Sequence, residues 1–316
     1  MIDKPKIVIL GGGSGLSTLL RGLKYYPVSL SGIVAMADNG ASSGRLSREL
    51  GVLPPGDVRK CLAALSDDEE LLTKLFEYRF QRGRGISGHA LGNLLLLALT
   101  DLTGSFEKAV QASSRILAIR GQVIPSTLQH VSIVAHLKNG QQALGETEIP
   151  IQGHRFGIET VTILPDNAQA NPTATHFIEN ADLLIFGPGS LFTSVVPNLL
   201  IQDIRRAVEK SSAQKIYVCN VSTERGETEK LSVEDHVKVV AKHLGRAKLD
   251  KVIVNNKTLI RSSNSGKLGS ICNITDGRKT VQGVSVVSAD VIDPAQPLFH
   301  DPKRLAEVIW QVFTKP

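Results

Sequence analysis

The stretch KIVILGGGSGLSTLLRGL near the N-terminus constrains the fold most, because a short apolar run passes through clustered glycines into an amphipathic segment. Residues 6–10 are rich in β-branched side chains and end at a glycine, which predicts a buried strand. Residues 15–24 have the apolar spacing of a helix, and residues 31–37 again have the composition of a strand. A strand, a helix and a strand in this order predict a parallel sheet.

The same alternation returns in the second half of the chain. Residues 181–190 predict a strand followed by a loop, and residues 215–220 and 249–256 predict two further strands. Between the last two, Ser232 is expected to cap a helix that stops at Gly245. We therefore expect an α/β fold, with a Rossmann-like, doubly wound and mainly parallel sheet and a small accessory α/β region.

A single domain over residues 1–316 is expected, in which two segments depart from this alternation. Residues from about 57 to 120 are predicted to be mainly helical, because apolar residues recur at steps of three and four. Within them, residues 88–102 are apolar on nearly every side, which predicts a helix buried in the middle of the fold. Residues from about 131 to 151 hold an Asn-Gly pair between two alternating runs, which predicts a β-hairpin excursion.

Composition excludes several classes of protein. The net charge of +6 is mild, and the Lys and Arg residues are scattered without interleaved aromatic residues, so small anions are better expected partners than nucleic acid. Three cysteines without a C-x-x-C pair argue against a disulfide framework or a zinc site and imply a reducing compartment. The longest apolar block, residues 94–99, is too short to span a membrane, and the N-terminus lacks a signal-peptide pattern. A cytoplasmic protein is expected.

Four predicted strands end in small, polar loops that contain glycine. These are GGGSG at residue 11, DNGASSGR at 38, GPGS at 187 and NVSTERGET at 220. In an open parallel sheet, ligands bind beyond the carboxyl ends of the strands, at the point where the strand order reverses. We expect the four loops to converge there, with backbone amides and a helix N-terminus that favour phosphate.

The first loop matches the dinucleotide pattern G-x-G-x-x-G only in part. Leu16 or Thr18 stands where the third glycine belongs, whichever register is chosen. Asp38 lies at the end of the second strand, where an acid would bind a ribose diol and favour NAD. A dinucleotide site, another phosphate loop and a tight turn without a ligand all remain open.

The other candidate residues each have a functional and a structural interpretation. Ser42, Ser43 and Arg45 suit a phosphate or a carboxylate, but this segment could equally be a helix N-cap with a solvated arginine. Asp57 could bind a hydroxyl group or a metal, or it could cap a helix. His89 could contact a ligand or serve the structure only. Residues 223–230 mix both charges and are expected to be partly solvated.

Several long motifs resemble one known family. They are ILGGGSGLSTLLRGLK, MADNGASSGRL, LPPGDVRKCLAALS, GHALGNLLLLAL, ADLLIFGPGSLFTSVVPNLL, IYVCNVSTERGETEKLSVEDHV and HDPKRLAEVI. From residue 6 to about 313 the chain is similar to the bacterial gluconeogenesis factor family, whose members are related to 2-phospho-L-lactate transferase of cofactor F420 synthesis.

This resemblance implies a function. The transferase branch binds a guanosine nucleotide, a metal and a deazaflavin, whereas the gluconeogenesis factor branch binds UDP-sugars such as UDP-N-acetylglucosamine or UDP-glucose. That branch is needed for cell shape and wall synthesis during growth on gluconeogenic carbon sources, and no reaction is established for it. A regulatory nucleotide-sugar-binding protein is therefore expected, as a homodimer that acts with cell-wall regulatory proteins. The alternatives are a transferase with Asp57 as the catalytic residue, for which a divalent metal stays open, and an NAD-binding protein.

The resemblance and the loop chemistry together give one set of expected ligand-binding residues. They are Gly11, Gly12, Gly13, Ser14, Gly15, Asp38, Asn39, Ser42, Ser43, Gly44, Arg45, His89, Asn93, Gly187, Gly189, Ser190, Thr193, Asn220, Thr223, Glu227, Thr228 and Arg304. No set of metal ligands is assigned.

The chain departs from the family pattern at three places. Asn39 stands where relatives commonly have a second aspartate, which weakens a metal-dependent transfer. Residues 257–298 contain no tyrosine to stack on a base, so the preferred base stays open. Phe299 precedes His300 where an arginine is expected, and Arg304 could supply the missing charge.

Overall fold

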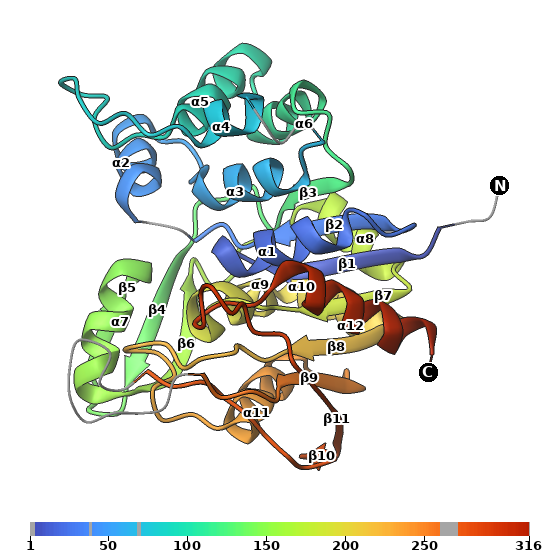
Figure 1. Ribbon diagram of the computed structural model, residues 1–316. Helices are drawn as coiled ribbons and strands as arrows, with labels where there is room; N and C mark the ends of the chain where they lie inside the picture. Colours follow the sequence, from blue (N-terminus) through green and yellow to red (C-terminus); the bar gives the residue numbers. More distant parts are fainter. Residues whose placement is uncertain (1–3, 38–39, 68–70, 260–270, 316) are drawn as a thin grey trace.

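An eight-stranded sheet forms the centre of the protein in the computed structural model, which describes residues 4–37, 40–67, 71–259 and 271–315 (Figure 1). The strand order is β10-β11-β9-β8-β7-β1-β2-β3, and every neighbouring pair is parallel except β10 and β11. The strands are β1 (Lys6–Gly11), β2 (Ser29–Val34), β3 (Gln122–Pro125), β7 (Leu183–Phe186), β8 (Gln214–Val218), β9 (Lys251–Asn255), β10 (Thr280–Val281) and β11 (Val284–Ala289). The predicted α/β class with a mainly parallel sheet is confirmed.

The strand order reverses between β1 and β7. From β1 the chain builds outward through β2 to β3, and it then returns to the other side of β1 as β7 and builds outward to β11. The two central strands are in register, with Ile7 beside Leu183 and Leu10 beside Phe186. Ligands bind at such a reversal in open α/β sheets, so the loops that follow β1 and β7 lie where a ligand is expected.

Helices cover both faces of this sheet, because β1 is apolar on both sides. Ile7 and Ile9 pack with α1, α3 and α12, while Val8 and Leu10 pack with α8 to α11. The helices are α1 (Gly13–Leu23), α3 (Gly56–Leu65), α12 (Pro302–Thr314), α8 (Pro172–Glu179), α9 (Val196–Leu200), α10 (Gln202–Lys210) and α11 (Val233–His243). Ser232 caps α11 through a reciprocal pair of bonds with Asp235, as the sequence predicts.

A group of helices, which we call the helical cap, lies above one edge of the sheet in Figure 1. It consists of α2 (Ala41–Leu50), α3, α4 (Leu71–Glu77), α5 (Leu91–Thr103) and α6 (Phe106–Ile116). The prediction that the apolar helix is buried in the middle of the fold is wrong. In α5 only Gly92, Asn93 and Leu96 are buried, and Leu102 is 82% exposed. The reason is that α5 packs on one side against α4 and α6, at the outside of the cap.

The accessory region is a three-stranded antiparallel sheet in the order β5-β4-β6, flanked by α7. Its elements are β4 (Ser132–Leu137), β5 (Gln142–Leu144), β6 (Ile158–Leu164) and α7 (Gly145–Phe156). The two arms of the expected hairpin pair as β4 and β5. The second arm is much shorter than expected, because the chain turns into α7 at Gly145, where φ is +82°. A third strand that the sequence did not reveal, β6, completes this sheet.

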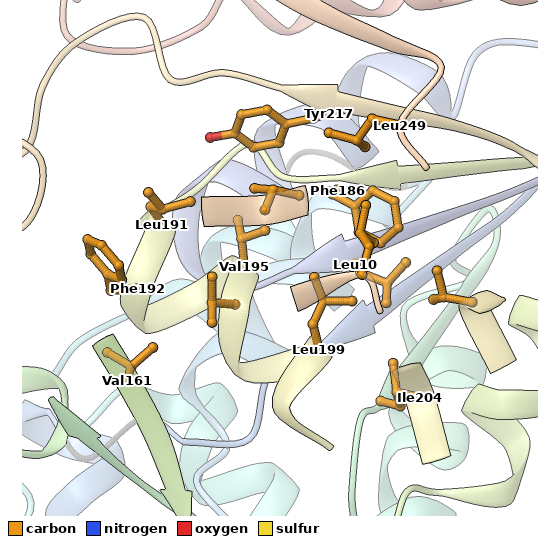
Figure 2. Packing of buried hydrophobic residues seen from close by; sticks show 14 of the residues in the cluster. Leu10, Val161, Phe186, Leu191, Phe192, Val195, Leu199, Ile204, Tyr217 and Leu249 are labelled. Atoms are coloured by element: carbon orange, nitrogen blue, oxygen red, sulfur yellow. The ribbon is translucent and has the colours of Figure 1, made fainter. Parts of the chain in front are cut away.

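A short π-helix, η1 (Leu191–Val195), follows β7 and joins α9 directly. Leu191, Val195 and Leu199 point into the core beside Leu10 and Phe186 (Figure 2). All five side chains are at most 1% exposed. This packing fixes the start of η1 against the carboxyl ends of β1 and β7.

Candidate functional site

The loops that follow β1, β7 and β8 line one cavity at the reversal of strand order, which we call the rim pocket. Its volume is about 170 Å³. The segment just before α12 closes one side, and single side chains from α3 and α7 complete the lining. The lining residues are Gly12, Gly13, Ser14, Gly15, Thr18, Lys60, Glu146, Pro188, Gly189, Ser190, Ser194, Asn220, Val221, Ser222, Glu224, Leu298, Phe299 and His300.

The three loops are held together by direct backbone contact. A Cβ atom at Gly15 would lie 2.4 Å from the Pro188 carbonyl oxygen, so only glycine lets the first loop approach the second this closely. The Asn220 amide then ties the second loop to the third. It donates to the Gly189 carbonyl oxygen at 3.0 Å and accepts from the Gly189 N–H at 3.1 Å. The convergence predicted from the sequence therefore has a physical basis for these three loops.

The N-terminus of α1 is already in contact with a carboxylate. The Gly13 N–H donates to Asp57 Oδ2 at 2.6 Å, and Lys60 Nζ donates to Asp57 Oδ1 at 2.9 Å. Asp57 is only 7% exposed. A carboxylate near the positive end of a helix is stabilising. Asp57 therefore occupies one of the backbone N–H groups at the start of α1, where the sequence predicts a phosphate. A phosphate at this point would have to bind beside Asp57.

Two glutamates of the loop after β8 turn toward the start of η1. Ser190 donates to Glu224 Oε1 at 3.1 Å, Thr193 donates to Glu227 Oε1 at 3.0 Å, and the Phe192 N–H donates to Glu227 Oε2 at 3.3 Å. The expectation that residues 223–230 are partly solvated is confirmed, because Arg225 and Lys230 are exposed and the two glutamates are half-buried. The sequence did not show that these two carboxyl groups turn inward.

Burial disfavours the charged form of both carboxyl groups. Burial, followed by the charge of Glu227, raises the pKa of Glu224 to about 8, and burial raises the pKa of Glu227 to about 7. Glu224 Oε2 is buried without a hydrogen-bond partner. The rim pocket thus contains an acid that holds its proton near neutral pH.

His300 is a second neutral group in the rim pocket. Burial lowers the pKa of its imidazole to about 4. Its Nε2 lies 3.2 Å from the carbonyl oxygen of Cys219. Because a carbonyl can only accept, Nε2 carries the ring proton and Nδ1 is left as an acceptor.

A second hollow adjoins the rim pocket beneath the helical cap, and we call it the basic pocket. It consists of two connected depressions of about 310 and 540 Å³ that share Ser42 and Thr147. Lys60 and Glu146 line both this hollow and the rim pocket. The other lining residues are Gly40, Ser43, Arg45, Arg48, Gly56, Arg59, Arg79, Gly88, Asn93, Leu144 and Glu148.

A buried hydrogen-bonded group supports one wall of the basic pocket. The Asn93 amide donates to Ser42 Oγ at 3.0 Å, and the same hydroxyl lies 2.9 Å from His89 Nδ1. Burial, followed by the charge of Arg45, lowers the pKa of His89. A neutral His89 can accept the Ser42 proton, which fits the hydroxyl receiving the Asn93 N–H. The partner that the sequence required for Asn93 is thus Ser42.

The structure divides the expected ligand-binding residues into groups. The rim pocket receives Gly12, Gly13, Ser14, Gly15, Gly189, Ser190 and Asn220, and the basic pocket receives Ser42, Ser43, Arg45 and Asn93. Asp38 and Asn39 lie outside the described residues. The others line neither pocket: Gly11, Gly44, Asp57, His89, Gly187, Thr193, Thr223, Glu227, Thr228 and Arg304.

Most residues of this last group do not line a pocket but contact residues that do. The Thr228 hydroxyl, for example, accepts from the Glu224 N–H at 2.9 Å and so holds the backbone of this loop in place. Arg304 is directed elsewhere, since it donates to Asp290 Oδ2 at 2.7 Å. Within the described ranges, no group of three or more His, Cys, Asp or Glu side chains could hold a metal ion. The described helices also include none with the length and apolar character needed to cross a bilayer.

Sequence reasoning missed several lining residues. Lys60 carries a local signal, because it stands three positions after Asp57 on a predicted helix and can reach its carboxylate. Glu224 carries a weaker signal, since it lies in the NVSTERGET loop that was predicted to reach the site. Glu146 and Arg79 come from segments far away in the chain, and no local pattern places them in the cleft.

Comparison with known proteins relates the chain to one family. The family model described as 2-phospho-L-lactate transferase CofD matches residues 7–292. The gluconeogenesis factor of Bacillus subtilis (strain 168) is 47% identical over 259 residues, which cover 82% of this chain and 81% of that protein. The gluconeogenesis factor of Halalkalibacterium halodurans is 38% identical over 312 residues, which cover 98% of this chain and 96% of that protein. The crystal structure of protein BH3568 from Bacillus halodurans has a TM-score of 0.91 at 37% identity and covers 98% of this chain and 100% of that one.

Proposed function

This chain belongs to the 2-phospho-L-lactate transferase CofD family, its relatives are named gluconeogenesis factors, and we propose that it is a regulatory protein that binds a nucleotide sugar. The ligand is of the UDP-N-acetylglucosamine or UDP-glucose type, and the bound protein supports cell shape and wall synthesis during gluconeogenic growth. One observation carries the proposal: three loops from three parallel strands line one cavity at the reversal of strand order.

The chemistry of the rim pocket suits an uncharged group that carries hydroxyls, such as the nucleoside of the ligand. Ser190, Ser222 and Asn220 offer hydroxyl and amide groups, and Glu224 holds its proton near neutral pH. Pockets for small molecules usually measure about 300–1,000 Å³, and the rim pocket at about 170 Å³ is below that range. A nucleotide sugar bound there must therefore extend past Lys60 into the basic pocket.

The contacts of Asp57 favour binding over the transferase alternative. That alternative uses Asp57 as the catalytic residue, but both of its oxygens are engaged, one by the Gly13 N–H and the other by Lys60. A side chain in these contacts stabilises the loop and the helix end. The proposal therefore assigns Asp57 a structural role in shaping the site.

Calorimetry with four ligands tests the proposal. We expect UDP-N-acetylglucosamine and UDP-glucose to bind, and GDP and NAD to bind more weakly. Asn220→Ala removes both bonds to Gly189, and we expect it to weaken UDP-N-acetylglucosamine binding by about tenfold, because a loop held by two hydrogen bonds loses its position.

Asn180→Ala is the matched control, because the Asn180 side chain lines neither pocket and bonds to His176 of the preceding helical turn. Absence of nucleotide-sugar binding at millimolar concentrations would refute the proposal. Stronger binding of NAD than of either UDP-sugar would favour the dinucleotide alternative, and turnover of a nucleotide-activated donor that is lost in Asp57→Asn would favour the transferase.

A further inference from the structure

The basic pocket contains an excess of positive charge that the neutral sugar of the proposed ligand does not explain. Five basic side chains line it: Arg45, Arg48, Arg59, Lys60 and Arg79. Two acidic side chains face them from α7, namely Glu146 and Glu148, and Lys60 is also paired with Asp57. A neutral sugar such as glucose offers these guanidinium groups no opposite charge.

Two of the arginines are held in place by uncharged groups, which leave their positive charge unbalanced. Arg45 donates to the Ser87 carbonyl oxygen at 2.9 Å, and Arg79 donates to the Gly88 carbonyl oxygen. A carbonyl orients a guanidinium group but carries no net charge. Because a guanidinium has five N–H groups, each of these arginines can still offer donors to a ligand.

The buried wall between these arginines offers a hydrogen-bond acceptor. The Asn93 side chain is 2% exposed, and its Oδ1 atom has no hydrogen-bond partner. An unsatisfied buried acceptor is costly and gains from a donor supplied by a ligand. A hydroxyl group next to an anion would therefore satisfy both Asn93 and the arginines.

The basic pocket lies next to the rim pocket, where the sugar end of a bound nucleotide sugar would be. Lys60 and Glu146 border both hollows, so a molecule that leaves the rim pocket enters the basic pocket directly. A nucleotide sugar bound as proposed would place its sugar in the second hollow. The group that meets the arginines is then a substituent of the sugar.

We propose that the basic pocket binds a carboxylate on the sugar, so that the protein prefers a nucleotide sugar of the uronic acid type over its neutral counterpart. The inference rests on the proposed function and narrows its ligand class. The carboxylate accepts from Arg45 and Arg79, and a neighbouring sugar hydroxyl donates to Asn93 Oδ1. Charge-assisted pairs of this kind are the stronger class of hydrogen bond, and arginine suits a carboxylate through its planar fork of donors.

A matched pair of ligands tests the proposal, because UDP-glucuronate and UDP-glucose differ only in the carboxylate at C6. We expect the wild-type protein to bind UDP-glucuronate at least about tenfold more tightly in calorimetry, which corresponds to about 1.4 kcal/mol. The ratio should fall as salt is added, since the contact is electrostatic and partly exposed. In Arg79→Gln we expect the ratio of the two affinities to fall to about threefold or less, because the carboxylate loses one of its two arginine partners.

Arg82→Gln is the matched control, because Arg82 is exposed in the same loop and lines neither pocket. If Arg79→Gln does not fold, Arg45→Gln serves as the second variant, with the same expected fall in the ratio, because Arg45 is the other proposed partner of the carboxylate. Equal affinity of the wild type for both ligands overturns this inference and leaves the proposed function standing. Equal weakening of both ligands in Arg79→Gln also overturns it, because the pocket would then hold the diphosphate. If neither ligand binds, the proposed function fails as well.

Discussion

The sheet edge and the helical cap build opposite halves of one cleft by different means. At the sheet edge, the three loops and the segment before α12 supply the rim pocket with backbone and with neutral or proton-holding side chains, and charged side chains enter only at its border, as Lys60 and Glu146. On the other side of Lys60, the basic pocket is lined by residues of α2, α3 and the loop before α5, which belong to the helical cap. Its arginines are partly or fully exposed, except Arg59, which is buried. The difference indicates that the first half selects by shape and the second by charge.

Gly15→Ala should have the largest effect, because it disrupts the sheet-edge half where the loops after β1 and β7 are in direct backbone contact. The added Cβ would lie 2.4 Å from the Pro188 carbonyl oxygen and 2.7 Å from Gly189 Cα, which are both backbone atoms. We expect a loss of about 2–3 kcal/mol in the free energy of unfolding and loss of ligand binding. Chemical denaturation compares it with Gly277→Ala, where no atom lies within 4 Å. A Gly15→Ala protein of wild-type stability would show that the loops are not closely packed.

Substitutions of Leu96 and Leu102 test the packing of the helical cap, because both leucines lie on α5 and one is buried while the other is exposed. Leu96 is fully buried and Leu102 is 82% exposed. Leu96→Ala should cost about 2–4 kcal/mol, whereas Leu102→Ala should cost less than about 0.5 kcal/mol. Urea denaturation measures both. Similar costs for the two variants would mean that α5 is covered on both sides.

Removing the charge of Asp57 tests the place where the two halves meet, because Asp57 contacts both Gly13 and Lys60. Asp57→Asn keeps an acceptor for the Gly13 N–H but removes the charge at the helix end, so we expect a loss of about 1 kcal/mol in stability. Removing this negative charge should also strengthen UDP-N-acetylglucosamine binding severalfold, because the ligand's diphosphate passes close by. Calorimetry measures the change. Weaker binding in Asp57→Asn would instead indicate that the carboxylate contacts the ligand.

The acid pair gives the sheet-edge half a pH dependence of its own. Glu224 and Glu227 have folded-state pKa values of about 8 and about 7, above the usual 4.5, so the folded chain keeps protons that the unfolded chain has released. Their contribution to stability is complete below pH 4.5 and is lost as the pH rises through 7 to 8. The pKa of His300, lowered to about 4, acts in the opposite direction between pH 4 and 6.5.

Stability is therefore best measured between pH 6.5 and 8. There we expect the unfolding free energy of the wild type to fall by about 1 kcal/mol, and Glu224→Gln to show a smaller fall. Glu179→Gln on α8 is the control, because that carboxylate is exposed and lies 3.5 Å from Lys210. Equal slopes in Glu224→Gln and the wild type would contradict the assignment of the protons.

The sheet was predictable because its strands carry local signals. Runs such as residues 6–10 and 249–256 are apolar on both faces, which is typical of strands buried between two layers of helices. The glycine loops after β1 and β7 follow from the same signals, since carboxyl ends of neighbouring parallel strands meet at one edge. The cap helix α5 was misplaced because apolar residues around a helix do not show which side its neighbours cover.

The polar half of the site was predictable only in part. Asn220 and Ser190 stand in recognisable loops, but their partners come from segments 31 and 34 positions away. Arg79 and Glu146 reach the cleft through the packing of the cap and of α7, which depends on contacts that no single window of sequence contains. Charge patterns alone likewise did not show that Glu224 is turned inward.

Hydrogen–deuterium exchange with and without UDP-N-acetylglucosamine tests the central claim most directly, because it reports on the amides of the three loops at the same time. The account predicts that the ligand slows exchange in residues 12–15, 188–190 and 220–224 together. Slower exchange in only one of these loops, or only in segments outside the rim pocket, would contradict it.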